Sequence, residues 1–111
     1  MELGQFSLSL AVKDINQSYK FYQTLGFTPL DGCGSVDEKW LILKKDAVVI
    51  GLFEGMFDDN ILTFNPADAR AIQSDLERQN IAIEKPCTGE KGATHFTVVD
   101  PDGNRLMFDQ F

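Results

Sequence analysis

Histidine and cysteine are scarce in this chain of 111 residues. The single histidine, His95, cannot build a metal site by itself, because such sites combine several donor side chains. The two cysteines, Cys33 and Cys87, both fall in sequence that contains glycine or proline and therefore predicts loops. Two thiols in a cytosolic protein are normally reduced, so the sequence predicts no disulfide framework.

Long apolar runs and an excess of basic residues are also missing. No apolar run approaches the roughly 18 residues of a membrane span, and the first residues lack a basic segment followed by an apolar one. We therefore expect a cytoplasmic protein with no membrane partner. Asp and Glu number 17 against 10 Lys and Arg, which gives a net charge of -7. Such a surface repels phosphate backbones, so no nucleic-acid partner is expected.

The length and composition are those of an ordinary globular domain. A chain of this size can bury one modest core and is too short for two independent ones. Apolar residues make up 43% of the chain and charged residues 24%, which argues against disorder and against a fibrous protein. We expect one domain spanning residues 1–111.

Strictly alternating side chains open the first half of the chain. Residues 6–12 alternate between large apolar and small or polar side chains, which predicts a strand with one face in the core. Asp14 follows as the predicted helix N-cap, and apolar residues at helical spacing continue until Gly26 ends the helix. Three further strands are predicted at residues 27–30, 39–43 and 47–53.

The second half shows the same order of elements. Residues 61–64 predict a strand, Asn65 a helix N-cap and Pro66 the first helical position, with the helix continuing to Asn80. Strand candidates follow at residues 81–84, 94–99 and 105–110, with a tight turn between the last two.

An internal duplication explains this likeness between the two halves. Corresponding residues are offset by about 54 positions, as in the pairs Leu10 and Phe64, Asp14 and Asp68, and Tyr22 and Leu76. Chance periodicity is the alternative, but the matching order of elements, caps and turns favours duplication. The sequence thus predicts two βαβββ modules, at about residues 5–54 and 60–111.

Two such modules predict an α+β fold. A four-stranded sheet covered by one helix leaves its other face open. We expect the two modules to form a curved mixed sheet or partial barrel around a cavity, with the helices outside. Strand parity predicts the residues that point into that cavity: Ser7, Ser9, Ala11, Val49, Gly51, Phe53, Ile61, Thr63, Met107 and Asp109.

Two sequence patterns near opposite ends of the chain resemble those of a known family. They are Leu8-x-Leu10-x-Val12-x-Asp14 ahead of a helix with Phe21-Tyr22-x-x-Leu25-Gly26-Phe27, and the turn Asp100-Pro101-Asp102-Gly103-Asn104. With the duplication, they make the chain similar to the vicinal oxygen chelate superfamily. That superfamily includes glyoxalase I, extradiol dioxygenases, fosfomycin-modifying enzymes and bleomycin resistance proteins, and the resemblance covers essentially the whole chain.

The resemblance also implies where a metal would bind. Metal-using members of the superfamily coordinate a divalent ion through His or Gln and Glu side chains on four inward-facing strands. The corresponding positions here are Ser7, a position at or near Gly51, Ile61 (or Asn60, if the register shifts by one) and Met107. This set cannot form a normal ligand sphere, which argues against glyoxalase or dioxygenase chemistry that depends on a Lewis-acidic metal. We therefore expect no metal and no cofactor.

Three single residues are further candidates for contacting a ligand. Trp40 is a possible stacking platform for a flat or cationic ligand, or else fills the core or a dimer contact. His95 either faces the cavity or is an exposed or merely packed residue. Asp109 is either a cavity carboxylate that binds a cation or acts as a base with a raised pKa, or a solvated residue at the rim.

The sequence therefore predicts a metal-independent small-molecule-binding protein that resembles bleomycin resistance proteins. The ligand would be small and partly apolar, and an acidic protein can favour a cationic one. The alternatives are a glyoxalase- or dioxygenase-like enzyme with an atypical metal site and an interaction domain whose cavity has closed. Unpaired sheet edges favour a homodimer. The predicted ligand-binding residues are Ser7, Ser9, Trp40, Gly51, Phe53, Ile61, Thr63, His95, Met107 and Asp109.

Overall fold

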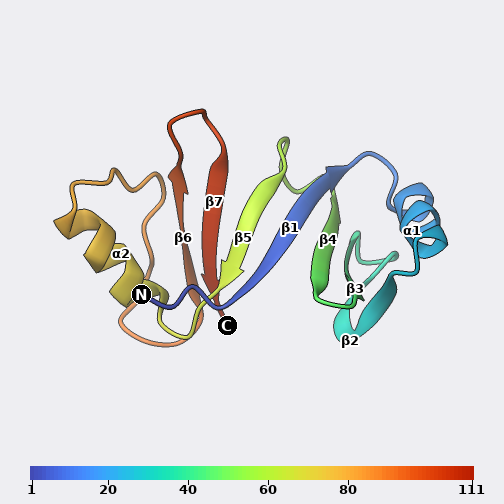
Figure 1. Ribbon diagram of the computed structural model, residues 1–111, viewed down its shortest axis with the longest axis horizontal. Helices are drawn as coiled ribbons and strands as arrows, with labels where there is room; N and C mark the ends of the chain where they lie inside the picture. The colour runs from blue at the N-terminus through green and yellow to red at the C-terminus, as the bar shows by residue number, and fades with distance from the viewer. The chain divides into compact units, whose positions relative to one another are not determined.

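The computed structural model describes residues 1–111 and contains seven strands and two helices (Figure 1). Two compact units divide the chain: module one, Ser7–Asn60, and module two, Met1–Phe6 together with Ile61–Phe111. Neither helix combines the length and apolar character that a membrane span requires. In chain order, the elements are β1 (Gln5–Val12), α1 (Ile15–Thr24), β2 (Thr28–Ser35), β3 (Trp40–Lys45), β4 (Val48–Glu54), β5 (Ile61–Asn65), α2 (Ala69–Arg78), β6 (Thr94–Val99) and β7 (Arg105–Gln110).

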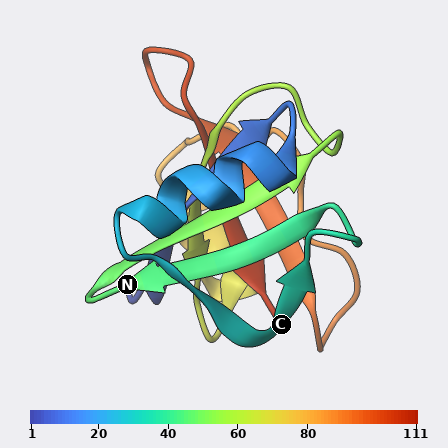
Figure 2. The same ribbon diagram turned by 90° about the vertical axis from the view of Figure 1, so that its right-hand side faces the viewer.

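Module one is a four-stranded mixed sheet with one helix. Its strands lie in the order β2-β3-β4-β1, with β1 parallel to β4 and β3 antiparallel to both of its neighbours. Helix α1 packs against one face of this sheet and lies in front of it in Figure 2. A parallel pair such as β1 and β4 needs a crossover connection, and α1 with the β2–β3 hairpin supplies it.

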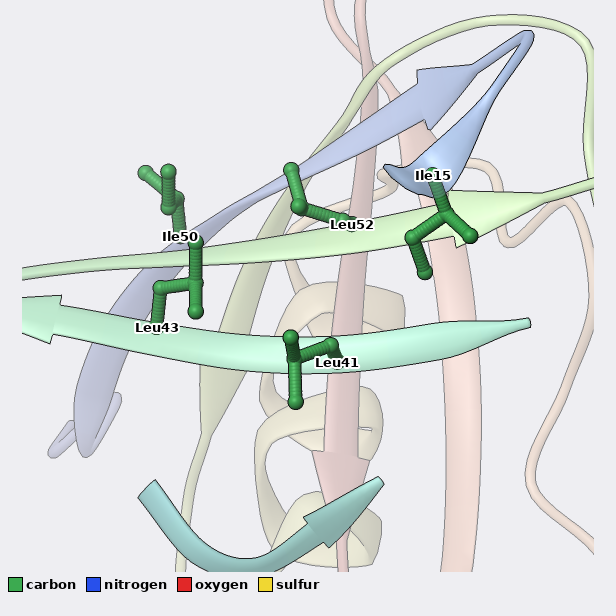
Figure 3. Close-up of a cluster of buried hydrophobic side chains, with 5 residues drawn as sticks. All are labelled: Ile15, Leu41, Leu43, Ile50 and Leu52. Atoms are coloured by element: carbon green, nitrogen blue, oxygen red, sulfur yellow. The ribbon is translucent and has the colours of Figure 1, made fainter. Parts of the chain in front are cut away.

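The core of module one lies between α1 and its sheet. Ile15, from the first turn of the helix, is fully buried against residues of two strands (Figure 3). Because alternate residues of a strand point to opposite faces, the intervening residues form the other face of the sheet. The strand residues of this core are Leu41, Leu43, Ile50 and Leu52.

Equivalent aspartates begin the two helices. The Asp14 carboxylate accepts hydrogen bonds from the Asn16 and Gln17 amides at 3.0 and 3.3 Å, and Asp68 accepts one from the Ala71 amide at 3.0 Å. The predicted cap at Asn65, with Pro66 in the first turn, is therefore wrong. The duplication itself had paired Asp14 with Asp68, and that pairing is confirmed as a pair of N-caps.

Module two packs a three-stranded sheet against α2. The strand order is β5-β7-β6, with β5 parallel to β7 and β6 antiparallel to it. Ala69 and Ile72 of the helix are buried with strand residues, and the rings of Phe64, Phe108 and Phe96 stack in series at centroid distances of 5.4 and 4.7 Å. These aromatic contacts supply much of the apolar area of the core.

The first six residues of the chain belong with module two. Leu3 packs against its core, and the ring of Phe6 lies 5.2 Å from that of Phe64. Gly4, with φ of 77°, lies so close to Asn65 that any Cβ would collide with the backbone carbonyl of that residue. Only glycine fits both that backbone conformation and that contact.

Two local predictions were wrong. Residues 81–84 form no strand, and only Lys85 makes an isolated bridge to Thr97. Pro86, which has no N–H to donate, follows that bridge at once, so the pairing cannot extend. Cys33 lies in β2 instead of a loop, between glycines with positive φ that accompany a register shift in the β2–β3 pairing. Cys87, as predicted, lies outside any strand or helix, and both thiols are free.

The predicted α+β fold, with one helix on one face of each module's sheet, is confirmed. The enclosed cavity remains a prediction. The turn that leads into β7 also has the expected geometry, because the Asp100 carboxylate accepts hydrogen bonds from the Asp102 and Asn104 amides at 2.9 and 2.8 Å and Gly103 has a φ of 89°.

Candidate functional site

The face of module one opposite α1 carries the residues predicted to contact a ligand in this half. The strand register pairs Ser9 with Gly51 and Gly51 with Ile42, so these three residues lie in one row across β1, β4 and β3. The next row contains Ala11, Phe53 and Trp40. Ser7 and Val49 share the parity of these rows, and both are buried.

An aromatic cluster dominates this face. The rings of Trp40 and Phe53 stack with centroids 6.3 Å apart and an interplanar angle of 9°, and Phe57 lies 5.3 Å from Phe53 at 47°. We call these three side chains the aromatic platform. Phe57 comes from the segment after β4 and was missed, because no periodic pattern there predicts its position. All three rings are partly exposed.

Gly51 leaves space on the sheet for the ring of Phe53. A Cβ at this position would lie 2.5 Å from Cε2 of Phe53 and 3.0 Å from Cδ1 of Ile42. The absence of a side chain at Gly51 is therefore what lets the Phe53 ring lie against the strand. A longer side chain here, such as a metal-binding carboxylate, has no space unless that ring moves.

In module two, the face opposite α2 carries the other predicted residues. Thr63, Met107 and Thr97 form one row across β5, β7 and β6, and Asp109 lies directly opposite His95 in the next. Ile61 lies at the far end of the same face, in register with Arg105. Thr63, Thr97 and Ile61 are buried, Met107 and Asp109 are half-buried, and His95 is exposed.

Asp109 has an unusual electrostatic environment for a carboxylate. Desolvation raises the pKa of the Asp109 carboxyl above its ordinary value, and the charge that His95 can carry opposes this only in part. Its carboxylate accepts no hydrogen bond and forms no ion pair within the chain. The side chain is half-buried, and both interpretations, a cavity carboxylate and a solvated residue at the rim, stay predictions.

Glu84 shows the opposite behaviour on the same module. Its two carboxylate oxygens accept hydrogen bonds from Nε and a terminal nitrogen of Arg105 at 2.8 and 2.9 Å, and the Thr97 hydroxyl donates another at 2.9 Å. The Arg105 and Thr97 hydrogen bonds lower the pKa of the Glu84 carboxyl to about 2. This paired carboxylate was missed, because its partners are not near it in the sequence.

The residues at the four positions that the resemblance implies do not fit a divalent metal. The four positions implied by the resemblance carry a hydroxyl, no side chain, an alkyl group and a thioether, and the ring of Phe53 fills the space at Gly51. No group of three or more His, Cys, Asp or Glu side chains is arranged to hold a metal ion. We therefore derive no step through a metal.

An open depression of about 470 Å³ lies at the start of α2. It is lined by residues of the N-terminal segment and the helix, including Met1, Gly4, Asp68 and Ile72. None of the predicted ligand-binding residues lines this depression. It is therefore no evidence for a ligand site on either of the two sheet faces.

Comparison with known families identifies the class of protein that this fold represents. The model of the Glyoxalase/Bleomycin resistance protein/Dioxygenase superfamily matches residues 4–108. The chain therefore belongs to this superfamily. A search of curated proteins found no match.

Solved structures show the same fold at low sequence identity. The chain is similar to the NAD-dependent benzaldehyde dehydrogenase from Legionella pneumophila, with a TM-score of 0.77, 21% identity and coverage of 96% of this chain and 98% of that one. A superfamily member from Vibrio splendidus 12B01 has a TM-score of 0.73, 21% identity and coverage of 96% and 97%.

A third similar structure is methylmalonyl-CoA epimerase from Streptomyces coelicolor in complex with 2-nitronate-propionyl-CoA. Its TM-score is 0.71 at 17% identity, and the match covers 98% of this chain and 95% of that one. Identities this low show the fold alone, so the function has to be argued from the side chains.

Proposed function

We propose that this protein binds a small, flat and partly apolar ligand on the aromatic platform of module one, without a metal, in the manner of bleomycin resistance proteins. The observation that carries the proposal is the Phe53 ring, which lies against Gly51 and stacks with Trp40. Stacked, partly exposed rings on the sheet face opposite the helix of their module can take another ring on their exposed area.

The platform provides its binding energy through apolar area and stacking. An aromatic pair in a favourable geometry contributes about 0.5–1.5 kcal/mol beyond the area that it buries, and a cation over Trp40 would add a comparable amount. The net charge of -7 favours cationic ligands over anionic ones through the field of the whole protein. A flat cation therefore satisfies more of the available interactions than a sugar or a phosphate.

The same residues argue against the metal-dependent alternative. Glyoxalase and dioxygenase chemistry uses a Lewis-acidic ion, and the position that would supply a carboxylate is Gly51, covered by the Phe53 ring. Restoring a ligand there would require removal of the platform. Binding by aromatic rings and coordination of a metal are thus competing uses of one position.

Titration with metal-free bleomycin, followed by the fluorescence of Trp40, tests the proposal. Trp40 is the only tryptophan, so the signal reports on the platform alone. We expect saturable quenching, weakened about tenfold or more in Phe57→Ala and in Phe53→Ala. Phe21→Ala is the matched control, because Phe21 is an exposed ring on α1, on the other side of the sheet.

Two outcomes would overturn the proposal. The first is the absence of saturable quenching at high micromolar bleomycin, or quenching that Phe21→Ala weakens as much as Phe57→Ala. The second is elemental analysis of the purified protein that finds a stoichiometric transition metal, which would favour the enzyme with an atypical metal site.

A further inference from the structure

The second sheet face contains a pair of ionisable side chains that the aromatic platform does not use. Strands β6 and β7 are antiparallel, and their register sets His95 directly opposite Asp109. Their sequence neighbours Phe96 and Phe108 are buried toward α2, so both side chains belong to the opposite face. Residues directly opposite each other on such strands have Cβ atoms about 4.5–5.5 Å apart, within reach of one shared small ligand.

Asp109 differs from the other acidic residues of the structure that are not fully exposed. Glu54 is held by the Ile15 amide and Lys39, Asp75 by Arg78, and Asp100 by the amides of its own turn. The half-buried Asp109 carboxylate has no hydrogen bond and no ion pair. A carboxylate that is partly removed from water and lacks a partner gains most from an incoming cation.

No cationic side chain of the chain fills this role. Arg105 lies on the same strand and face, but its guanidinium is engaged by both oxygens of Glu84. His95 is the one titratable group that affects Asp109 electrostatically. The two side chains form no hydrogen bond and no ion pair with each other. The position therefore suits an exogenous cation.

Met107, the apolar neighbour of His95 and Asp109, favours a ligand with an apolar part. Met107 precedes Asp109 by two residues, so its half-buried thioether lies on the same face in the adjacent row. Thioethers adapt to ring edges and irregular apolar groups. A ligand with a charged nitrogen over Asp109 can thus place carbon atoms on Met107.

The backbone that carries Asp109 is fixed from both sides. Nδ2 of Asn65 donates a hydrogen bond to the Asp109 carbonyl at 3.0 Å, across the β5–β7 pair. The next side chain, Gln110, accepts from the Ala69 amide at 2.8 Å and donates to the Gly92 carbonyl at 3.0 Å. With the backbone held in this way, only the side-chain torsions of Asp109 have to be ordered when a ligand binds.

From this arrangement we propose that Asp109 and His95 form a binding site for a small organic ammonium ion with an apolar body, on the face of module two opposite α2. The ammonium group donates hydrogen bonds to the Asp109 carboxylate and to a ring nitrogen of His95, and the body lies on Met107. This site uses no residue of the aromatic platform.

Titration with benzylamine at about pH 8, with benzyl alcohol as the uncharged analogue, tests the site. His95 is the only histidine, so its ring C–H signals in an NMR spectrum report on the pair without ambiguity. We expect a saturable shift with benzylamine, little with benzyl alcohol, and affinity reduced about tenfold or more in Asp109→Asn. Asp37→Asn, the same change of charge at an exposed site, is the control and should bind as the parent does.

Three results would overturn the proposal. They are equal affinity for benzyl alcohol, unchanged affinity of Asp109→Asn, and a shift of the Trp40 indole signal with no shift at His95, which would place the amine on module one. Should Asp109→Asn lose its folded amide spectrum, His95→Gln is used instead, with the Met107 methyl signal as the readout, and an unchanged affinity again contradicts the site.

Discussion

The ring of Phe53 lies against Gly51, where a Cβ would come within 2.5 Å of its Cε2 atom. This contact joins the fold to the proposed function, because one residue provides the space and the other provides the binding surface. The aromatic ring and a longer side chain at position 51, such as a metal-binding carboxylate, cannot occupy the same volume.

Substitution of Gly51 tests that contact directly. Gly51→Ala should destabilise the protein by about 1–3 kcal/mol, because the added methyl group displaces the Phe53 ring in a packed region. Chemical denaturation followed by circular dichroism measures the change. In a protein that already carries Phe53→Ala, the further change Gly51→Ala should cost much less unfolding free energy than it does in the parent. An equal cost in both backgrounds would mean that the two residues do not compete for space.

The two helix caps should contribute comparably. Replacement of Asp14 or Asp68 by Ala removes the acceptor for helix amides and should cost about 1 kcal/mol of unfolding free energy, whereas Ser should retain most of it. Thermal unfolding of each variant checks this. Asp37→Ala, in an exposed turn, serves as the control. A loss at Asp37 equal to that at either cap would contradict the assignment.

Glu84 should make stability depend on acid. Its folded-state pKa of about 2 lies below the unfolded value near 4.5, so its contribution is present above pH 4.5 and is lost as the pH falls toward 2. We expect Glu84→Gln to be less stable than the parent at pH 7 and the difference to shrink across that range. Urea denaturation at a series of pH values measures it, and a difference that is independent of pH would exclude the Arg105 pair as its source.

The contribution of Asp109 to stability should depend on pH in the opposite direction to that of Glu84. A carboxyl whose folded-state pKa is raised opposes folding once it ionises, so the cost appears as the pH rises through the unfolded value and is absent in strong acid. Asp109→Asn should therefore raise the melting temperature at pH 7 and change it little at pH 3. If Asp109→Asn instead lowers the melting temperature at pH 7, Asp109 stabilises the fold, and it is not a ligand-binding residue that lowers the stability of the protein.

Local chemistry explains which parts of the structure could be predicted. The alternation in residues 6–12 and the offset between Asp14 and Asp68 follow from strand and cap geometry that each segment encodes for itself. The faces of Trp40 and His95 were also predicted, because parity needs no tertiary information. These features place the candidate residues on their sheets.

Features that depend on distant partners could not be predicted. Phe57 joins Phe53 only through the course of the segment after β4, and Glu84 meets Arg105 only once residues 84 and 85 lie beside β6. Residues 81–84 have the composition of a strand, but Pro86 ends their pairing after one bridge. Helix α2 likewise begins after Asp68 and not after Asn65, because the side-chain amide of Asn65 donates a hydrogen bond to the Asp109 carbonyl on β7.

The most direct test of the central claim is the Trp40 indole N–H signal of ¹⁵N-labelled protein, titrated with metal-free bleomycin in excess EDTA and compared with protein never treated with chelator. We predict a saturable shift with the same affinity in both samples. Loss of the shift after chelation, or no saturable shift in either sample, would contradict a metal-independent aromatic site.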